Sequence, residues 1–143
     1  MEKRDLEVHE KTIIGSFPNT YTFTKRMAEH LLVENNRKGI PLVIVRPSII
    51  GASLDEPFPG WTDSITLAGG IYLIAGMGIL RELPGDQNNI GDQVPVDIVV
   101  NQLLLSVPMA VHQKKTANDP LLITHSSTSS INPVVWREVI QYL

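Results

Sequence analysis

The stretch Pro41-Leu42-Val43-Ile44-Val45-Arg46 lies between Gly39 and Pro47 and decides the fold class. Its four successive apolar residues favour a strand and do not alternate with polar ones, so both faces of that strand are expected to be buried. Such a strand is typical of the centre of a parallel sheet. We therefore predict an interior strand over residues 41–46.

A helix is predicted before this strand, over residues 20–38. Phe23, Met27 and Leu31 are spaced four apart and form an apolar stripe of helical period. Asn19 or Thr20 can cap the start of the helix. A helix followed by a short loop and a buried strand indicates a layered α/β fold. We expect the apolar stripe to pack on the sheet.

The middle of the chain is predicted to be mostly loop. Residues 47–63 contain three Pro and two Gly together with Phe58 and Trp61, which favours a long loop with aromatic anchors. Residues 64–80 are almost uncharged and hold four Gly. A buried helix or a flexible apolar wall is expected there, with a membrane span as the alternative. Residues 81–93 are predicted to be a polar loop.

Two helices and a strand are predicted in the last third. A helix over residues 95–107 would begin at Pro95, with Asp97 serving its N-terminus. Residues 121–124 form a short aliphatic run that predicts a strand. Asn132-Pro133 predicts the cap and first residue of a final helix.

Composition indicates one globular domain of 143 residues. Twelve Lys and Arg against 15 Asp and Glu give a net charge of −3, so we expect no nucleic-acid partner. The absence of Cys excludes disulfides and thiolate metal sites, and the four His show no ligand spacing, so no metal is expected. The charged start, Met1 to Asp5, predicts no secretory signal.

Tyr21 and Lys25 are the candidate catalytic residues. Their spacing of four places both side chains on one face of the predicted helix. An ammonium held near a phenol favours the phenolate, so such a tyrosine can exchange a proton with a substrate oxygen. The same spacing also occurs in helices where both residues are simply solvated.

The loop after the predicted strand is the second candidate region. Ligands of open α/β sheets bind just beyond the carboxyl ends of the strands. The loop Pro47-Ser48-Ile49-Ile50-Gly51 follows such an end directly. We therefore expect this loop and the face that bears Tyr21 and Lys25 to meet at one site.

Several motifs together resemble one family. These are Tyr21-Thr-Phe-Thr-Lys25, Arg46-Pro-Ser-Ile-Ile-Gly-Ala-Ser53, Glu56-Pro-Phe-Pro-Gly-Trp61, Gly76-Met-Gly-Ile-Leu-Arg81 and Val94-Pro-Val-Asp-Ile-Val-Val-Asn101. In this order they resemble the fatty acyl-CoA reductases, extended short-chain dehydrogenases that are also called male-sterility-type reductases. The first motif is common to many short-chain dehydrogenases, whereas the second and third are much more specific.

The resemblance implies a fold, a cofactor and roles for the candidate residues. The fold would be a partial Rossmann-like α/β fold, the second half of an extended short-chain dehydrogenase domain. The reaction would be NADPH-dependent reduction of a long-chain acyl-CoA, through an aldehyde, to a fatty alcohol. Tyr21 would be the general acid and would also lie at the cofactor, and Lys25 would assist it and hydrogen-bond the nicotinamide ribose. Pro47, Ser48 and Ile49 would lie against the nicotinamide.

The resemblance also implies partners and a location. Residues 64–80 would wall an acyl site or touch a membrane surface. An intracellular, membrane-associated setting at the peroxisome or the endoplasmic reticulum would follow.

No Gly-rich strand–turn–helix occurs in the sequence. We therefore expect residues 1–143 to be a partial reductase domain that lacks the N-terminal dinucleotide-binding half and is truncated at the C-terminus. Such a piece is expected to be inactive alone.

Two alternatives remain open. One is a non-catalytic structural or interaction subunit, in which a protein partner would cover the open sheet. The other is a different extended short-chain dehydrogenase, such as an epimerase or a sterol dehydrogenase, against which the block Glu56 to Trp61 argues.

Overall fold

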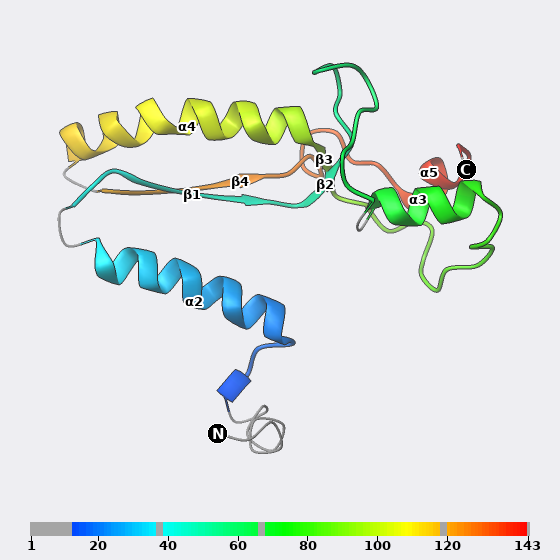
Figure 1. The fold of residues 1–143 in the computed structure, drawn as a ribbon, viewed down its shortest axis with the longest axis horizontal. Coiled ribbons are helices and arrows are strands. Elements are labelled where there is room, and N and C mark those ends of the chain that lie inside the picture. The colour runs from blue at the N-terminus through cyan, green and yellow to red at the C-terminus, as the bar shows by residue number, and fades with distance from the viewer. Residues whose placement is uncertain (1–12, 37–38, 66–67, 118–119, 143) are drawn as a thin grey trace. The chain divides into compact units, whose positions relative to one another are not determined.

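The computed structural model describes residues 13–36, 39–65, 68–117 and 120–142, so the charged start, Met1 to Asp5, lies outside the described residues. The chain divides into two compact units, Met1–Ile40 and Pro41–Leu143, and each is described by itself. Parallel strands and helices alternate in the second unit (Figure 1). This is the partial Rossmann-like α/β fold that the sequence predicts.

The first unit contains helix α2, Thr20–Asn35. Asn19 caps it as predicted, since its Oδ1 accepts the Thr22 N–H at 2.9 Å. The helix ends at Asn35 rather than at residue 38, and residues 37–38 lie outside the described residues. The expected packing of its apolar stripe on a sheet stays a prediction.

The second unit has strand β1, Leu42–Pro47, paired in parallel with β4, Leu121–Ser126. The register runs from Leu42 opposite Leu121 to Pro47 opposite Ser126. Of the six β1 residues only Ile44 is buried, and β4 is the one strand paired with β1 in the part of the chain that the structure describes. The prediction of an interior strand is therefore wrong for these residues, although the parallel pairing is confirmed.

Helix α4, Val96–Ala117, lies along this strand pair (Figure 1). Val99, Ser106 and Ala110 are buried and share the helix face that the spacing of seven and four residues defines. Two glutamines of α4 fasten it to β4, because Gln102 Nε2 donates to the His125 carbonyl at 3.2 Å and Gln113 Nε2 to the Leu121 carbonyl at 2.7 Å.

The observed α4 corrects the predicted helix over residues 95–107. Pro95 ends strand β3, Gln93–Pro95, and is not the first helical residue. The helix continues through Pro108 to Ala117. Proline ordinarily ends a helix, but the anchoring of Ala110 and Gln113 against the sheet stabilises the turns that follow it.

The predicted loop over residues 47–63 contains a short strand, β2, Ile49–Gly51, which pairs in parallel with β3. This strand was missed because three residues are too few to show a period. Helix α3, Ala68–Gly76, occupies the apolar stretch 64–80, yet Leu73 and Ile74 are exposed, so the helix is not a buried one. No helix among the described residues is both long and apolar enough to cross a membrane.

The final helix, α5, is Trp136–Ile140 with Val135 at its N-cap, so the predicted start at Asn132-Pro133 is wrong. The preceding residues are held instead by an extended backbone contact with residues 87–91. Gly91 N–H donates to the Val134 carbonyl at 2.8 Å, and Trp136 N–H donates to the Asn89 carbonyl at 3.1 Å. These long-range bonds keep residue 134 out of the helix.

Candidate functional site

Tyr21 and Lys25 form a contacting pair on α2. The Lys25 Nζ lies 5.6 Å from the centroid of the Tyr21 ring, a cation–π distance. Tyr21 is 67% exposed, so its hydroxyl is open to a ligand. The pairing that the spacing predicts is therefore present.

The start of α2 is fixed around this pair. Thr24 Oγ1 donates to the Tyr21 carbonyl at 3.0 Å, one turn into the helix. Phe17, before the Asn19 cap, packs edge-to-face on Phe23 with ring centroids 5.6 Å apart. Cap and ring contact together fix where the helix begins, and hence the direction in which Tyr21 points.

Pro47, Ser48 and Ile49 form the link between the two strand pairs of the second unit. The Ser48 N–H donates to the Ser126 carbonyl at 2.8 Å, and the Ile49 N–H donates to the Asp92 carbonyl at 3.1 Å. These bonds place the three residues at the carboxyl end of β1, where a parallel sheet binds its ligands.

Asp92, which the sequence analysis did not single out, holds this region together. Its carboxylate accepts the Thr128 N–H at 3.0 Å and the Ser129 Oγ–H at 2.9 Å. The Thr128 N–H is the main reason that the pKa of Asp92 lies below 3.8, against an opposing effect of burial. Asp92 thus fastens the segment after β4 beside Ser48.

Asp97 has a larger role than the helix N-terminus that was predicted for it. Its carboxylate accepts the Ile98 N–H at 3.1 Å, as an N-terminal acid does, but also three backbone N–H groups of the distant loop. These come from Leu54 at 3.0 Å, Asp55 at 2.9 Å and Glu56 at 3.2 Å. The bonds from Asp55 and Leu54 lower the pKa of Asp97 from 3.8 to about 2.

Ser53, at the start of the same loop, binds the far end of the loop. Its Oγ–H donates to the Phe58 carbonyl at 2.6 Å, and its Oγ accepts the Trp61 N–H at 3.1 Å. The Ser53 N–H also donates to the Trp61 carbonyl at 2.9 Å. The specific block Glu56 to Trp61 is therefore a closed loop, pinned by two buried polar side chains.

The candidate residues thus form two groups, one in each unit. Tyr21 and Lys25 contact each other in the first unit, and Pro47, Ser48 and Ile49 are consecutive in the second. Their meeting at one site stays a prediction. Within the described ranges, His, Asp and Glu side chains form no group of three that could hold a metal ion.

Asp92 and Asp97 could have been suspected from residue type, because a short carboxylate beside a Gly or a helix start readily accepts backbone N–H groups. Nothing in the sequence indicates which distant loop would supply the donors. Those loops lie 36 and 42 residues away for the Asp92–Thr128 and Asp97–Asp55 bonds.

Parallel strands joined through a helix, with polar residues gathered at their carboxyl ends, define a Rossmann-like α/β protein. An NAD-binding family model described as "Male sterility protein" matches residues 1–103, and the chain belongs to this family. Members of this family therefore bind a nicotinamide cofactor. The family resemblance read from the motifs is confirmed.

Named relatives agree. The chain is 41% identical over 131 residues to fatty acyl-CoA reductase 1 of Rattus norvegicus. The match covers 92% of this chain and 25% of the relative. It is 41% identical over 127 residues to fatty acyl-CoA reductase 1 of Homo sapiens and 40% identical over 129 residues to fatty acyl-CoA reductase 2 of Mus musculus. Each match covers 89% of this chain and 24% of the relative. The chain spans about a quarter of the length of the curated relatives it matches.

Proposed function

We propose that the chain is the catalytic part of an NADPH-dependent reductase of long-chain acyl-CoA. The first reduction adds one hydride and one proton to the thioester, breaks its carbon–sulfur bond and releases the thiol of coenzyme A and an aldehyde. The second adds another hydride and proton to the aldehyde and yields a fatty alcohol. Each reduction therefore needs a proton donor next to the carbonyl oxygen.

The observation that supports this proposal best is the contact between Lys25 and Tyr21 inside the family-matched region. In the proposed mechanism the Tyr21 hydroxyl donates its proton to the carbonyl oxygen as negative charge develops there. The Lys25 ammonium stabilises the phenolate that remains. The exposure of Tyr21 allows a carbonyl to reach its hydroxyl.

Residues 47–49, at the carboxyl end of β1, are proposed to hold the carboxamide of the nicotinamide. The Ser48 hydroxyl is buried, and it lies close enough to the Asp92 carboxylate to help lower the pKa of that carboxyl. A buried hydroxyl can both donate to and accept from an amide, so Ser48 would hold the carboxamide and Pro47 and Ile49 would flank the ring. When bound, the cofactor supplies the hydride. The Gly-rich turn for its pyrophosphate would come from outside residues 1–143, as would the C-terminal end of the domain.

Replacement of Tyr21 by Phe tests the proposal in the protein that contains the complete dinucleotide-binding half. Acyl-CoA reduction should fall by at least about 10²-fold, the usual contribution of a general acid, while NADPH affinity stays the same. Arg26→Met changes an exposed cation of the same helix and should leave the rate within about twofold, since an exposed substitution has little effect. Normal reduction by a folded Tyr21→Phe protein would exclude Tyr21 as the acid.

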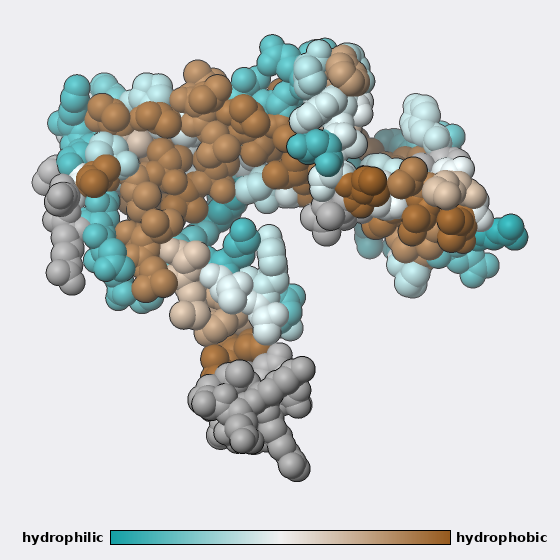
Figure 2. All heavy atoms as spheres, in the orientation of Figure 1, coloured by the Kyte–Doolittle hydropathy of each residue, from teal (hydrophilic) through white to brown (hydrophobic). Residues whose placement is uncertain are grey.

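The interaction-subunit alternative also has an observation in its favour. Leu104, Leu105 and Val107 of α4 are 66%, 66% and 58% exposed, and Figure 2 shows apolar side chains gathered over this part of the second unit. Exposed apolar patches mark surfaces that bind other molecules. In this alternative a protein partner covers the patch, and Tyr21→Phe changes no turnover because there is none.

A membrane setting completes the proposal. Long-chain acyl-CoA is amphiphilic, so the enzyme would work at a membrane surface, of the peroxisome or of the endoplasmic reticulum. Fractionation of cells that express the tagged protein tests this, and recovery away from both membranes would contradict it.

A further inference from the structure

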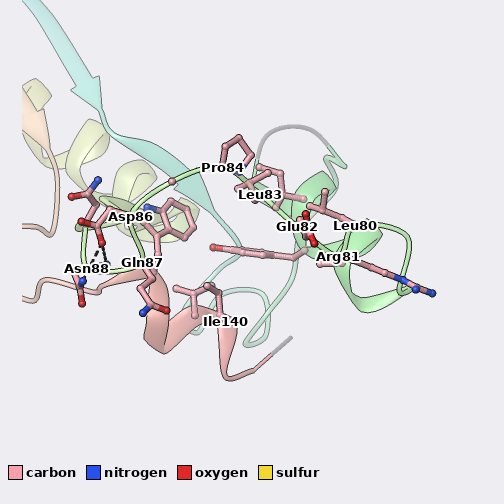
Figure 3. A pocket seen from close by; sticks show the side chains of 16 residues that line it. Leu80, Arg81, Glu82, Leu83, Pro84, Asp86, Gln87, Asn88 and Ile140 are labelled. Carbon is pink, nitrogen blue, oxygen red and sulfur yellow. Dashed lines mark hydrogen bonds between the residues drawn. The ribbon is translucent and has the colours of Figure 1, made fainter.

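A cavity of about 840 Å³ lies in the second unit between α3, the segment 80–89 and α5 (Figure 3). Its walls are mostly apolar, and most of their polar groups lie along residues 81–89. The main apolar contributors are Ile71, Ala75, Leu83, Trp136, Val139 and Ile140. A cavity of this size and lining is typical of a site for an apolar ligand.

The walls of the cavity are held by long-range contacts rather than by loop conformation alone. The Arg137 N–H donates to the Gln87 carbonyl at 2.9 Å, and the Trp136 N–H donates to the Asn89 carbonyl at 3.1 Å. A Cβ on Gly91 would lie only 3.1 Å from the Trp136 ring, so the backbone at Gly91 packs directly on the indole. The α5 wall is thereby fixed to the segment opposite.

The charges around the cavity favour an acyl chain over the nucleotide part of coenzyme A. Two carboxylates, Glu82 and Asp86, and one cation, Arg81, belong to the lining. In Figure 3 the Arg81 side chain extends away from the cavity, whereas Leu83 and Ile140 border it from opposite sides. Phosphates would meet repulsion from the carboxylates, but a hydrocarbon chain would not.

The cavity is linked to the predicted cofactor segment through one side chain. Tyr72, which lines the cavity, accepts a hydrogen bond at its hydroxyl from Gln93 Nε2. Gln93 is the register partner of Ile49, the last of the three residues expected to contact the nicotinamide. A ligand in the cavity therefore lies next to the strand pair that carries this segment.

A second cavity of about 580 Å³ adjoins the first. It shares Tyr72 and Val139 with it and continues along α5 to Gln141 and Tyr142. The side chains of Tyr72 and Val139 border both spaces, so the second cavity lies directly beside the first.

We infer that the cavity between α3 and α5 binds the acyl chain of the substrate, with the thioester end at Tyr72 and the hydrocarbon end toward Leu83 and Ile140. The thioester part of this inference rests on the proposed function. The binding of a long hydrocarbon chain rests on the cavity itself and can be measured without cofactor or turnover.

Trp136 provides the reporter for a test on the full chain. Trp61→Phe leaves Trp136 as the only tryptophan. A palmitate that carries bromine at mid-chain quenches an indole on contact, so it should quench Trp136 saturably below its critical micelle concentration. Unlabelled palmitate and palmitoyl-CoA should relieve the quenching, and coenzyme A without an acyl chain should not.

Ala75→Phe should fill the cavity and weaken binding of the brominated palmitate by at least about tenfold, because shape in an apolar pocket decides affinity on this scale. Ile74→Phe is the matched control, since Ile74 is the exposed neighbour on α3 and does not line the cavity. It should bind as the parent does. Val139→Phe repeats the test from α5 in case Ala75→Phe does not fold.

Three results would overturn the inference in chains whose circular dichroism matches the parent: no saturable quenching, equal binding by the cavity and control variants, or displacement by coenzyme A as strong as that by palmitoyl-CoA. Binding without reduction in the complete protein would leave the inference intact and contradict the reductase function. Reduction by the complete protein without quenching of Trp136 would contradict this inference and leave the reductase function intact.

Discussion

The carboxylate of Asp97 in α4 accepts the backbone N–H of Asp55 at 2.9 Å, across 42 positions of the chain. With the N–H groups of Leu54 and Glu56 it turns the start of the loop after β2 around one buried side chain. A carboxylate that accepts several backbone N–H groups fixes their directions together. Asp97 therefore determines the course of the loop that contains the most family-specific motif.

Asp97→Asn should loosen this loop. The amide keeps the size of the side chain, but its NH₂ end would face backbone N–H groups that need an acceptor. The melting temperature should fall by a few degrees, and protease cleavage within residues 54–61 should become faster. Asp63→Asn, at an exposed position close by in sequence, is the control and should change neither. Equal melting of the two variants would show that the loop does not depend on Asp97.

The pH dependence of stability should report the same contact. The pKa of Asp97 is lowered from 3.8 to about 2, so its charged form is favoured in the folded state and its stabilising effect is complete above pH 3.8. That effect is lost as pH falls from about 4 toward 2. Urea unfolding across this range should show a steeper decline for the parent chain than for Asp97→Asn. Parallel curves would contradict the lowered pKa.

Gly91→Ala should disturb the α5 wall of the cavity. The added Cβ would lie 3.1–3.4 Å from three atoms of the Trp136 ring, so the indole must shift. Overpacking of this kind costs about 1–3 kcal/mol, and the emission of Trp136 in the Trp61→Phe background should move to longer wavelength. Gly85→Ala, where no atom lies within 4 Å of the new Cβ, should be close to neutral. An unshifted emission in Gly91→Ala would show that the contact is not close.

Local patterns predicted the elements that local interactions stabilise. The cap at Asn19 and the helix after it need only residues within one turn, and the aliphatic runs that became β1 and β4 are recognisable from composition. The parallel pairing of β1 followed from its lack of alternation. These features require no knowledge of the rest of the chain.

Features that depend on distant partners were missed. Helix α4 passes Pro108 because the residues beyond it are anchored on β4, and α5 begins late because Gly91 and Asn89 hold residues 134–136 extended. Strand β2 exists only because Asp92 and Gln93 pair with Ile49. The roles of Asp92 and Asp97 were missed for the same reason, since their hydrogen-bond donors lie in loops that are remote in sequence.

The last prediction separates the two proposed tasks of Lys25. Lys25→Met keeps the length and the apolar stem of the side chain and removes the ammonium that lies 5.6 Å from the Tyr21 ring centroid. In the protein with the complete dinucleotide-binding half, the rate of acyl-CoA reduction should fall by at least about 10²-fold. NADPH binding should also weaken, because the ammonium is proposed to hydrogen-bond the nicotinamide ribose.

Arg26→Met is the matched control, since Arg26 is the neighbouring cation on α2. Its ion pair with Glu29, at 3.6 Å, has a cation that is 62% exposed, and such surface pairs contribute little. It should keep both rate and affinity within about twofold. Steady-state kinetics at varied NADPH, with direct titration of the cofactor, distinguish the outcomes. Tyr21→Phe should lower the rate alone, whereas Lys25→Met should lower the rate and the affinity. A Lys25→Met protein that loses rate but binds NADPH normally would remove the ribose contact and leave Lys25 with the single task of assisting Tyr21.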